Sequence, residues 1–493
     1  MVCLVGAVAY PEIGLAVGGP ASLAYAAREA GDGSADKPLA PQRKRLTERA
    51  DEERPDESLV LPLWGRPLTL SGEYEIKTSF DGDLRLDDAK EDDRARMRHK
   101  LELELFYPLT EAVSAFVEGK AFHERDLYRE DGERREASFL ERGETWIHAA
   151  GLGGSGLSLQ LGRQNFKDVR EWWWDTDLDS VRLHYDHERW HAELAVAEEL
   201  GRVSTEEDFL DPEQEDVLRV LAHARVQVAR RHRIELFALH QNDRSGTEGI
   251  GRIVDQDRRD EVDGDLTWLG LRALGRWGLG SHGKLHYWWN GALVRGEEAA
   301  IDYDDAGGGR SFVDGVSERR VSGWALDAGL TWATRWAGRP SLSLGYAVGS
   351  AGEADASVDR SFRQTGLHDN DGRFRGVDRF RYYGELLEPE LSNLHIGTLS
   401  VGMPVLESSS VELAYHYYHQ VRAADFLRDS RLRADPDGRR RSIGHELDLI
   451  VGIEEWERVR LELVGAAFRA GAAFDDERGE LAFRTVAKVE FLF

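Results

Sequence analysis

The feature that most limits how this chain can fold is an alternation of apolar and polar residues with a period of two, which dominates from Pro67 to the C-terminus. Lys100–Leu105 (KLELEL) and Arg458–Leu463 (RVRLEL) are clear examples. In an extended strand, such a sequence puts apolar side chains on one face and charged ones on the other. No run of about 18 apolar residues occurs, which excludes an α-helical membrane protein but not a β-barrel.

The connections between these segments are of two kinds that alternate along the chain. Tight turns such as Gly151–Gly156 separate long charged loops, which are Asp81–Arg94, Glu124–Glu136, Gly201–Glu215, Asn242–Asp263, Glu297–Arg319 and Ala423–Arg441. This is typical of outer-membrane barrels, with turns in the periplasm and loops outside, whereas a soluble sandwich has shorter, more even connections.

Roughly 19 candidate strands run from Leu68–Phe80 to Leu481–Phe493, and bacterial single-chain barrels normally have an even number. We therefore predict an all-β chain whose residues 67–493 form one closed antiparallel transmembrane barrel of 18 strands. Closure would pair every backbone group, as a hydrocarbon environment demands.

The N-terminal region differs in composition from the rest. Ala24-Tyr25-Ala26 follows an apolar stretch and fits a small-x-small cleavage site, so residues 1–26 are expected to be a signal peptide, with a truncated start because basic residues are missing. Residues 27–66 are charged and poor in aromatics, and we expect them to be disordered or irregular.

Charge narrows the possible partners. The formal net charge is -27, which argues against a nucleic-acid-binding surface but leaves room for a local basic patch. The single cysteine, Cys3, can form no internal disulfide.

An arginine-rich run, Ser361–Gly384, is the first candidate site. If Phe380 and Tyr382 face lipid, Arg379 and Arg381 face the lumen, where guanidinium groups can pair with the carboxylates of a passing anion. The alternative is that these arginines pair with nearby Asp and Glu and only stiffen the barrel. Counting strands from the two ends of the chain gives opposite answers for the side of the membrane on which residues 352–376 lie.

A second block begins at Ser138. Alternation puts Arg142, Glu144 and His148 on one face, and it puts Arg163 on the lipid face unless a bulge near Gly162 redirects it or it lies above the membrane edge. Three consecutive tryptophans follow at 172–174. They could belong to an aromatic girdle or a sugar-stacking platform, but inward packing is the favoured interpretation.

These blocks carry a family resemblance. Gly162-Arg163-Gln164 followed by Trp-Trp-Asp, then SFRQTGL from Ser361, RYYGE from Arg381 and PELSNL from Pro389, resemble the alginate-export family in this order. The resemblance implies an 18-stranded barrel with a narrow, arginine-lined lumen flanked by acidic residues. By this resemblance the first candidates for the constriction are Arg363, Arg373, Arg379 and Arg381, and the second are Arg142, Glu144, Arg163 and Arg460.

The predicted function follows from barrel and resemblance together. We expect passive export of an anionic, alginate-like polysaccharide through an anion-selective pore in the outer membrane of a Gram-negative bacterium. Expected partners are the polymer, outer-membrane lipid and periplasmic secretion proteins, and the chain is expected to be monomeric. The alternatives are an uptake porin for small acidic sugars or other anions and, less favoured, a barrel enzyme acting on surface polysaccharide.

One enzyme motif matches by letter. His187-Glu188-Arg189-Trp190-His191 has the H-E-x-x-H pattern of zinc proteases, which requires a helix. Here a tight turn leads into an alternating strand, where the two histidines would lie about 13 Å apart, too far to share one zinc ion. The sequence therefore predicts neither a catalytic site nor a cofactor or metal.

Overall fold

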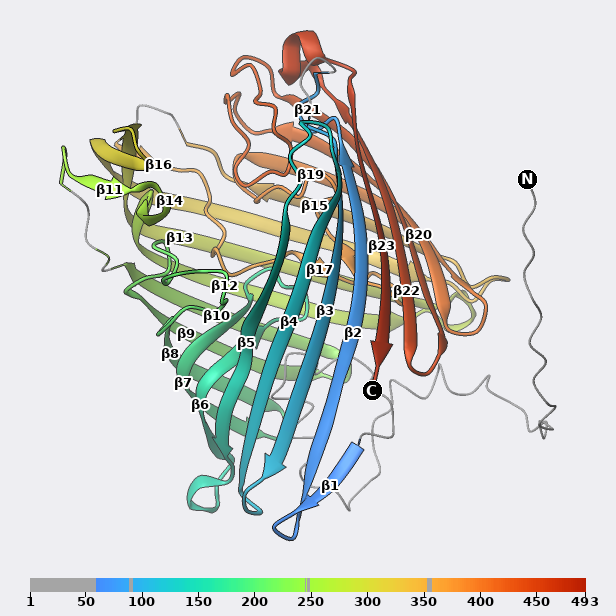
Figure 1. Ribbon diagram of the computed structural model, residues 1–493. Coiled ribbons are helices and arrows are strands. Elements are labelled where there is room, and N and C mark those ends of the chain that lie inside the picture. Colours follow the sequence, from blue (N-terminus) through green and yellow to red (C-terminus); the bar gives the residue numbers. More distant parts are fainter. Residues whose placement is uncertain (1–58, 88–91, 244, 246–248, 353–356) are drawn as a thin grey trace, which may run out of the picture. The chain divides into compact units, whose positions relative to one another are not determined.

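The computed structural model describes residues 59–493 apart from 88–91, 244, 246–248 and 353–356. Eighteen long antiparallel strands close into a barrel, because the first of them, β2, pairs with the last, β23 (Figure 1). The strands are β2 (Arg66–Gly82), β3 (Arg94–Pro108), β4 (Val113–Arg129), β5 (Glu136–Ala149), β6 (Leu157–Lys167), β7 (Asp175–His187), β8 (Trp190–Glu198), β9 (Val217–Ala229), β10 (His232–Asp243), β12 (Val262–Gly278), β13 (Lys284–Asp305), β14 (Arg310–Ala333), β15 (Ser341–Gly349), β19 (Leu394–Val405), β20 (Ser409–Gln420), β21 (Ser442–Trp456), β22 (Val459–Ala470) and β23 (Leu481–Leu492). The predicted architecture is confirmed.

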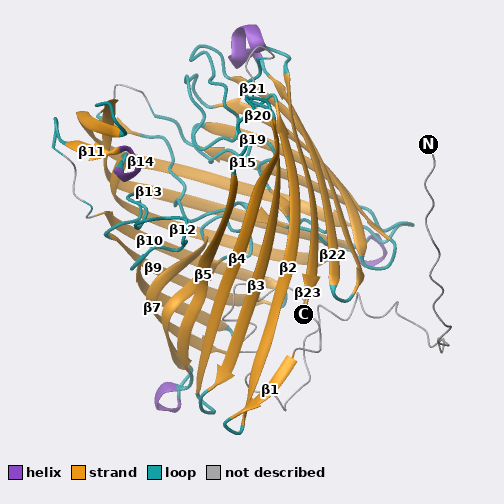
Figure 2. Cartoon of the chain, viewed as in Figure 1, coloured by secondary structure: helices purple, strands orange, loops and turns teal. Residues whose placement is uncertain are grey.

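Shorter elements lie at the rims and inside the barrel. They are β1 (Leu59–Leu63), β11 (Ile253–Asp255), β16 (Val358–Asp359), β17 (Asp371–Gly372), β18 (Phe380–Arg381) and the 3-10 turns η2 (Leu152–Gly154), η3 (Gln256–Arg258), η4 (Gly280–His282) and η5 (Ala472–Glu477). Among the residues that the structure describes, helical turns occur only at these connections (Figure 2). Within the described part of the chain, no helix has both the length and the apolar character needed to cross a membrane.

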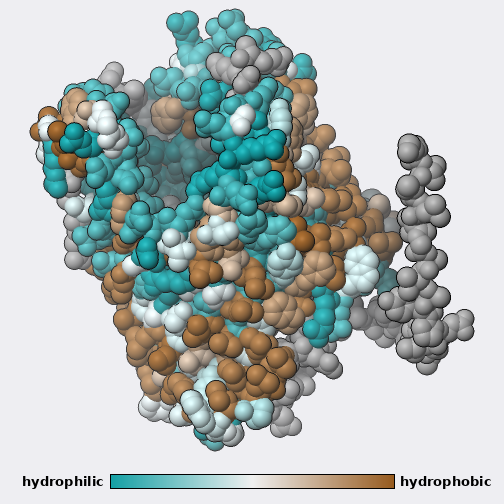
Figure 3. All heavy atoms as spheres, viewed as in Figure 1, coloured by the Kyte–Doolittle hydropathy of each residue, from teal (hydrophilic) through white to brown (hydrophobic). Residues whose placement is uncertain are grey.

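The alternation seen in the sequence separates the two faces of the wall. On β3, Leu101, Leu103 and Leu105 are about two-fifths exposed, while Glu102 and Glu104 between them are buried inside the barrel. Apolar residues gather on the outer wall towards the end that carries the short turns, and hydrophilic residues surround the hollowed opposite end (Figure 3). A lipid-facing outer surface and a polar lumen satisfy both environments.

Two predicted boundaries differ from the structure. Residues 27–66 are expected to be disordered or irregular, but Leu59–Leu63 forms β1 and pairs with the start of β2. Most of Glu297–Arg319, expected as a loop, instead continues the β13–β14 hairpin, because cross-strand pairing persists beyond the membrane-facing part of the wall. The expected signal peptide, residues 1–26, lies outside the described residues.

A long connection between β15 and β19 fills the interior. Its described residues 357–393, here called the plug, include β17 and β18 and enter from the end that carries the long loops (Figure 1). Counting strands from the two ends of the chain gives opposite answers for this segment. The structure shows that it begins and ends at the end of the barrel that carries the long loops. Leu386, Leu387 and Leu391 of the plug are completely buried.

Candidate functional site

One side of the plug rests on an apolar cluster. The β6–β7 connection turns inward and buries Trp172, Trp173 and Trp174 to within 3% exposure. The Trp172 ring stacks on Phe362 of the plug with centroids 6.3 Å apart, and Trp173 stacks on Phe237 of β10 at 4.9 Å. The three tryptophans therefore pack inward, as favoured, and their burial is incompatible with a girdle or a sugar platform.

Hydrogen bonds also hold the plug in place. Trp172 Nε1 donates to the Tyr383 hydroxyl at 2.6 Å, and Trp268 Nε1 donates to the carbonyl of Arg363 at 2.8 Å. Glu446 of β21 accepts the backbone N–H groups of Leu386 and Leu387 at 2.6 and 3.0 Å. Buried polar groups that are fully bonded hold one conformation, so the plug is anchored to the wall at these points.

Residues 371–385 of the plug border a charged cavity of about 170 Å³. Its wall comes from β2 and β21–β23 near the short-turn end, since Glu454 and Arg460 flank the β21–β22 turn. The basic residues that line it are Lys77, Arg373, Arg379, Arg381, Arg460 and Lys488. The acidic ones are Asp371, Asp378, Glu385, Glu454, Glu462 and Glu490. Six cations thus face six carboxylates, and the lining has no formal excess of either sign.

Most of these cations are paired with protein carboxylates. Arg379 pairs with the buried Glu171 and lies 3.5 Å from Asp371. Arg381 contacts Asp369 at 2.7 Å and also pairs with Glu388.

Arg373 and Lys77 differ, since neither side chain has an ion pair with a described residue, and Lys77 is largely buried in the wall. Arg373 is exposed at the cavity.

Burial changes the proton affinity of acids in the plug. It raises the pKa of Asp371 to about 7, against the opposing effect of Arg381. Burial likewise raises the pKa of Glu390 to about 7, although Arg428 lies 3.6 Å away. Burial, with Glu462 nearby, raises the pKa of Asp378 well above its ordinary value. A charge on these groups costs free energy because desolvation disfavours the ionised form.

Of the eight residues selected from the sequence, the structure brings Arg373, Arg379, Arg381 and Arg460 together at the cavity. Arg363 lies elsewhere. It is 5% exposed and pairs with Glu298 of β13 at 3.1 Å and with Asp359 at 2.6 Å. The prediction that Arg363 lines the constriction is therefore wrong. The plug contacts β13 at this point, and the guanidinium group is enclosed between the plug and the wall.

A β-bulge separates two of the other candidates. Pairing between β4 and β5 shifts register between Val117 and Gly119, which inserts one residue into β5. As a result Glu144 points inward, fully buried, and accepts from Trp146 Nε1 at 3.0 Å. Arg142 instead shares the outer face with the exposed Leu140, so the predicted common face is wrong.

Arg142 and Arg163 meet outside the lumen, under the β8–β9 loop. Arg142 binds Asp179 in a bidentate pair at 2.7 and 2.9 Å and donates to the Gly201 carbonyl at 2.6 Å. Arg163 lies 3.6 Å from Glu199 and is buried by the loop. Arg163 therefore stays on the outer face and lies beyond the lipid-facing part of the wall, as the second of the two explanations predicts. Neither Arg142 nor Arg163 lines the pore.

The aromatic neighbours of Arg379 also differ from expectation. Phe380 and Tyr382 do not face lipid but are buried inside the plug with Phe374, at centroid distances of 4.9 and 5.2 Å. Alternation in Asp378–Tyr383 comes from the two-residue pairing of β17 with β18 and not from a wall strand.

Sequence reasoning missed Lys77 and Lys488. Both follow the alternation of their strands, with Glu73 and Glu75 before Lys77 and Glu490 after Lys488. Extending the inner-face alternation to every basic residue of β2 and β23 would have found them.

Comparisons with known proteins show the family of the chain and support its fold. Residues 66–488 match the family described as alginate export. The chain belongs to this family. Relatives in the family include the alginate production protein AlgE of Pseudomonas aeruginosa, 30% identical over 66% of this chain and 65% of the relative. The alginate production protein AlgE of Pseudomonas syringae pv. tomato is 26% identical over 64% of this chain and 65% of the length of that relative. The chain thus spans slightly less than two thirds of these relatives.

Solved structures support the fold. OccK8 (OprE) of P. aeruginosa superposes with a TM-score of 0.54 and 11% identity, covering 86% of this chain and 98% of its own. The outer membrane protein OpdK of the same organism superposes with a TM-score of 0.51 and 10% sequence identity, covering 86% of this chain and 98% of OpdK. Family and fold together support an outer-membrane barrel of a Gram-negative bacterium.

Proposed function

We propose that this member of the alginate-export family passes an anionic, alginate-like polysaccharide along the charged side of the plug. Membership of the family over residues 66–488 carries this proposal, since the relatives are named for alginate production. A polyuronate bears one carboxylate on each sugar, which suits a path of guanidinium and ammonium groups.

The mechanism is exchange of ion pairs. An incoming carboxylate first meets Arg373, which is exposed and unpaired within the described structure. It then replaces Asp371 beside Arg379 and Asp369 beside Arg381, one pair at a time. After each polymer carboxylate moves on, the protein carboxylate pairs with its arginine again. No single ion pair therefore holds the polymer tightly. Transport is passive and driven by the supply of polymer.

Ion selectivity tests this mechanism. Replacing Arg373, Arg379, Arg381 and Arg460 by Gln would change the cavity lining from a formal balance to four excess carboxylates. In planar bilayers we expect wild type to be weakly anion-selective and blocked by oligouronates, and the fourfold variant to be cation-selective and unblocked. A matched Arg142→Gln/Arg163→Gln variant, altered outside the lumen, should behave as wild type. Cation selectivity of wild type would contradict the mechanism.

Direction is tested in cells. In a strain that makes a uronate polymer, loss of this protein should retain polymer in the periplasm, and wild type but not the fourfold variant should restore its release. Growth on oligouronates that depends on this protein, without any effect on release, would instead support uptake. We further propose that the barrel acts as a monomer and receives polymer from periplasmic secretion proteins.

A further inference from the structure

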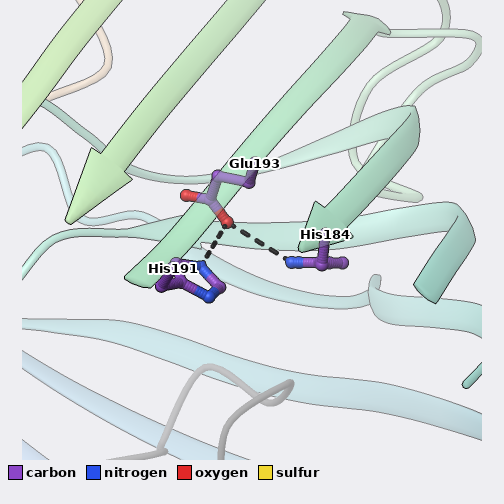
Figure 4. A group of neighbouring side chains, drawn as sticks. All are labelled: His184, His191 and Glu193. Atoms are coloured by element: carbon purple, nitrogen blue, oxygen red, sulfur yellow. Dashed lines mark hydrogen bonds and ion pairs between the residues drawn. The ribbon is translucent and has the colours of Figure 1, made fainter. Parts of the chain in front are cut away.

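A second polar cluster lies on the inner wall of β7 and β8, away from the charged cavity. His184 and Glu193 are direct cross-strand partners, and the next pair on the same face is Asp186 with His191. Figure 4 shows the two imidazole rings converging on the Glu193 carboxylate. Regular strand pairing, not a loop, therefore sets the positions of the three side chains.

The separations match those in a tetrahedral metal site. His184 Nδ1 and His191 Nε2 each lie 3.5 Å from the same oxygen, Glu193 Oε2. All three atoms fall within 4.8 Å of one another. Zinc binds such atoms at about 2.0–2.2 Å, which puts tetrahedral ligands roughly 3.3–3.5 Å apart. Two of the three separations already have that value.

The other nitrogen of each ring is occupied by a hydrogen-bond partner. His191 Nδ1 lies 2.9 Å from Asp186 Oδ1, and His184 Nε2 lies 3.1 Å from Gln160 Oε1. Asp186 can only accept, so Nδ1 of His191 carries the proton and Nε2 is left to point at Glu193. An outer partner that fixes the ring in this way is the usual companion of a metal-binding histidine.

The facing atoms call for a cation between them. A neutral His191 would direct a lone pair at the carboxylate of Glu193, an unfavourable contact unless a proton or a metal ion intervenes. His184 is 4% exposed, and its Nδ1 has no hydrogen-bond partner among the described residues. One metal ion would satisfy both nitrogens together, and the alternative is a neutral His184 that donates its Nδ1–H to Glu193 beside a protonated His191.

Arg182 is the main charge that opposes a metal ion here. Its Nη2 and Nε lie 2.6 and 3.1 Å from Glu193 Oε2. The guanidinium is held over the Phe166 ring and donates to the Asn165 carbonyl at 3.0 Å, so it serves as a fixed outer donor to the carboxylate. His223 also faces this carboxylate, with its Nδ1 3.2 Å from Glu193 Oε1. With all three histidines neutral, Asp186 and Glu193 outweigh Arg182 by one negative charge, which leaves the cluster attractive to a dication.

We propose that His184, His191 and Glu193 bind a divalent transition-metal ion of the zinc type. Imidazole nitrogens favour zinc, copper or nickel over calcium and magnesium, which prefer oxygen ligands. The H-E-x-x-H motif is not the origin of this site, because its first histidine, His187, is exposed beyond the cluster. The site arises from cross-strand pairing, which brings in His184 instead.

Zinc titration of the purified full-length protein in detergent tests the proposal. After chelator treatment, wild type should take up one tightly bound Zn²⁺ per chain, measured by competition with a coloured chelator. His191→Ala and Glu193→Gln should each abolish this tight binding. Asp186→Asn, which removes only the outer partner, should weaken it about 10- to 100-fold. His187→Ala is the matched control and should bind as wild type.

Folding is checked separately by the heat-dependent gel mobility of the barrel, and Glu193→Gln keeps the shape of the side chain. Cobalt substitution adds a second readout, because tetrahedral Co²⁺ gives a visible absorption band that should appear only with an intact cluster. If folded wild type binds Zn²⁺ no more tightly than folded Glu193→Gln, the cluster holds protons only and the proposal is wrong. Loss of binding in His187→Ala would equally contradict it.

Discussion

The two sides of the plug are built from different interactions. Towards the tryptophan cluster, a buried ring stack and a hydrogen bond attach Phe362 and Tyr383 to Trp172 of the β6–β7 connection. Towards β22 and β23, charged groups face one another across a cavity. A carboxylate substrate can replace an ion pair but cannot replace buried apolar packing. The plug is therefore held by apolar packing in one place, while in the other its ion pairs are the contacts that we propose a substrate exchanges.

Removing a ring from the anchored side should have the largest effect. Trp173→Ala would leave a cavity beside Phe237, at a cost of about 3–5 kcal/mol. We expect a lower unfolding temperature and frequent fluctuations of single-channel current as the plug loosens. Trp336→Ala, at an exposed turn, is the matched control and should change neither. A quiet, stable Trp173→Ala channel would show that the cluster does not anchor the plug.

The next effect depends on pH and acts on the anchored side. Folding raises the pKa of Glu390 to about 7, so its stabilising contribution is complete below its ordinary value near 4.5 and disappears as pH rises through about 7. The docked plug should lose up to about 3 kcal/mol of local stability between pH 4.5 and pH 8.

Amide hydrogen exchange of Gln364, whose backbone N–H donates to Glu390, measures this change. Exchange corrected for the intrinsic pH effect should rise towards pH 8 in wild type and stay flat in Glu390→Gln. This local readout is needed because Asp371, on the charged side, titrates in the same direction. The same rise in both proteins would rule out Glu390 as the cause.

On the charged side a single substitution should cost less. Arg379→Gln deprives the buried Glu171 of one partner, but Lys167 still lies 2.8 Å away. We expect a loss of about 1–2 kcal/mol and a measurable shift of reversal potential towards cations. Arg379→Lys should retain most of the selectivity. A shift in Arg379→Lys as large as that in Arg379→Gln would mean that charge at this position does not set selectivity.

The smallest effect is expected outside both regions. Arg142→Gln removes a bidentate pair with Asp179 beneath the β8–β9 loop, worth about 0–1 kcal/mol at a half-exposed site. Unfolding by denaturant should report this small loss, and conductance should not change. A change in ion selectivity would place Arg142 on the pathway after all.

Much of the wall could be predicted from the sequence because alternation is a local property. The eighteen strands and the lipid-facing leucines of β3 follow from it directly. The bulge that turned Arg142 outward depends on pairing with β4, and the enclosure of Arg363 depends on Glu298, which is 65 residues away. Such contacts are set by the closed barrel, so a single sequence cannot show them. Lys77 and Lys488, by contrast, were within reach of the alternation argument.

The most direct test of the account asks along which side of the plug a polyanion passes. Arg373→Cys, in a protein with Cys3 replaced, puts one thiol at the charged cavity, and Arg142→Cys puts one on the outer face. The rate of reaction with a small neutral thiol reagent is measured with and without oligouronate. The account predicts that oligouronate slows the reaction at position 373 several-fold and leaves position 142 unchanged. Equal rates at position 373 with and without oligouronate, in a channel that the same oligouronate blocks, would contradict it.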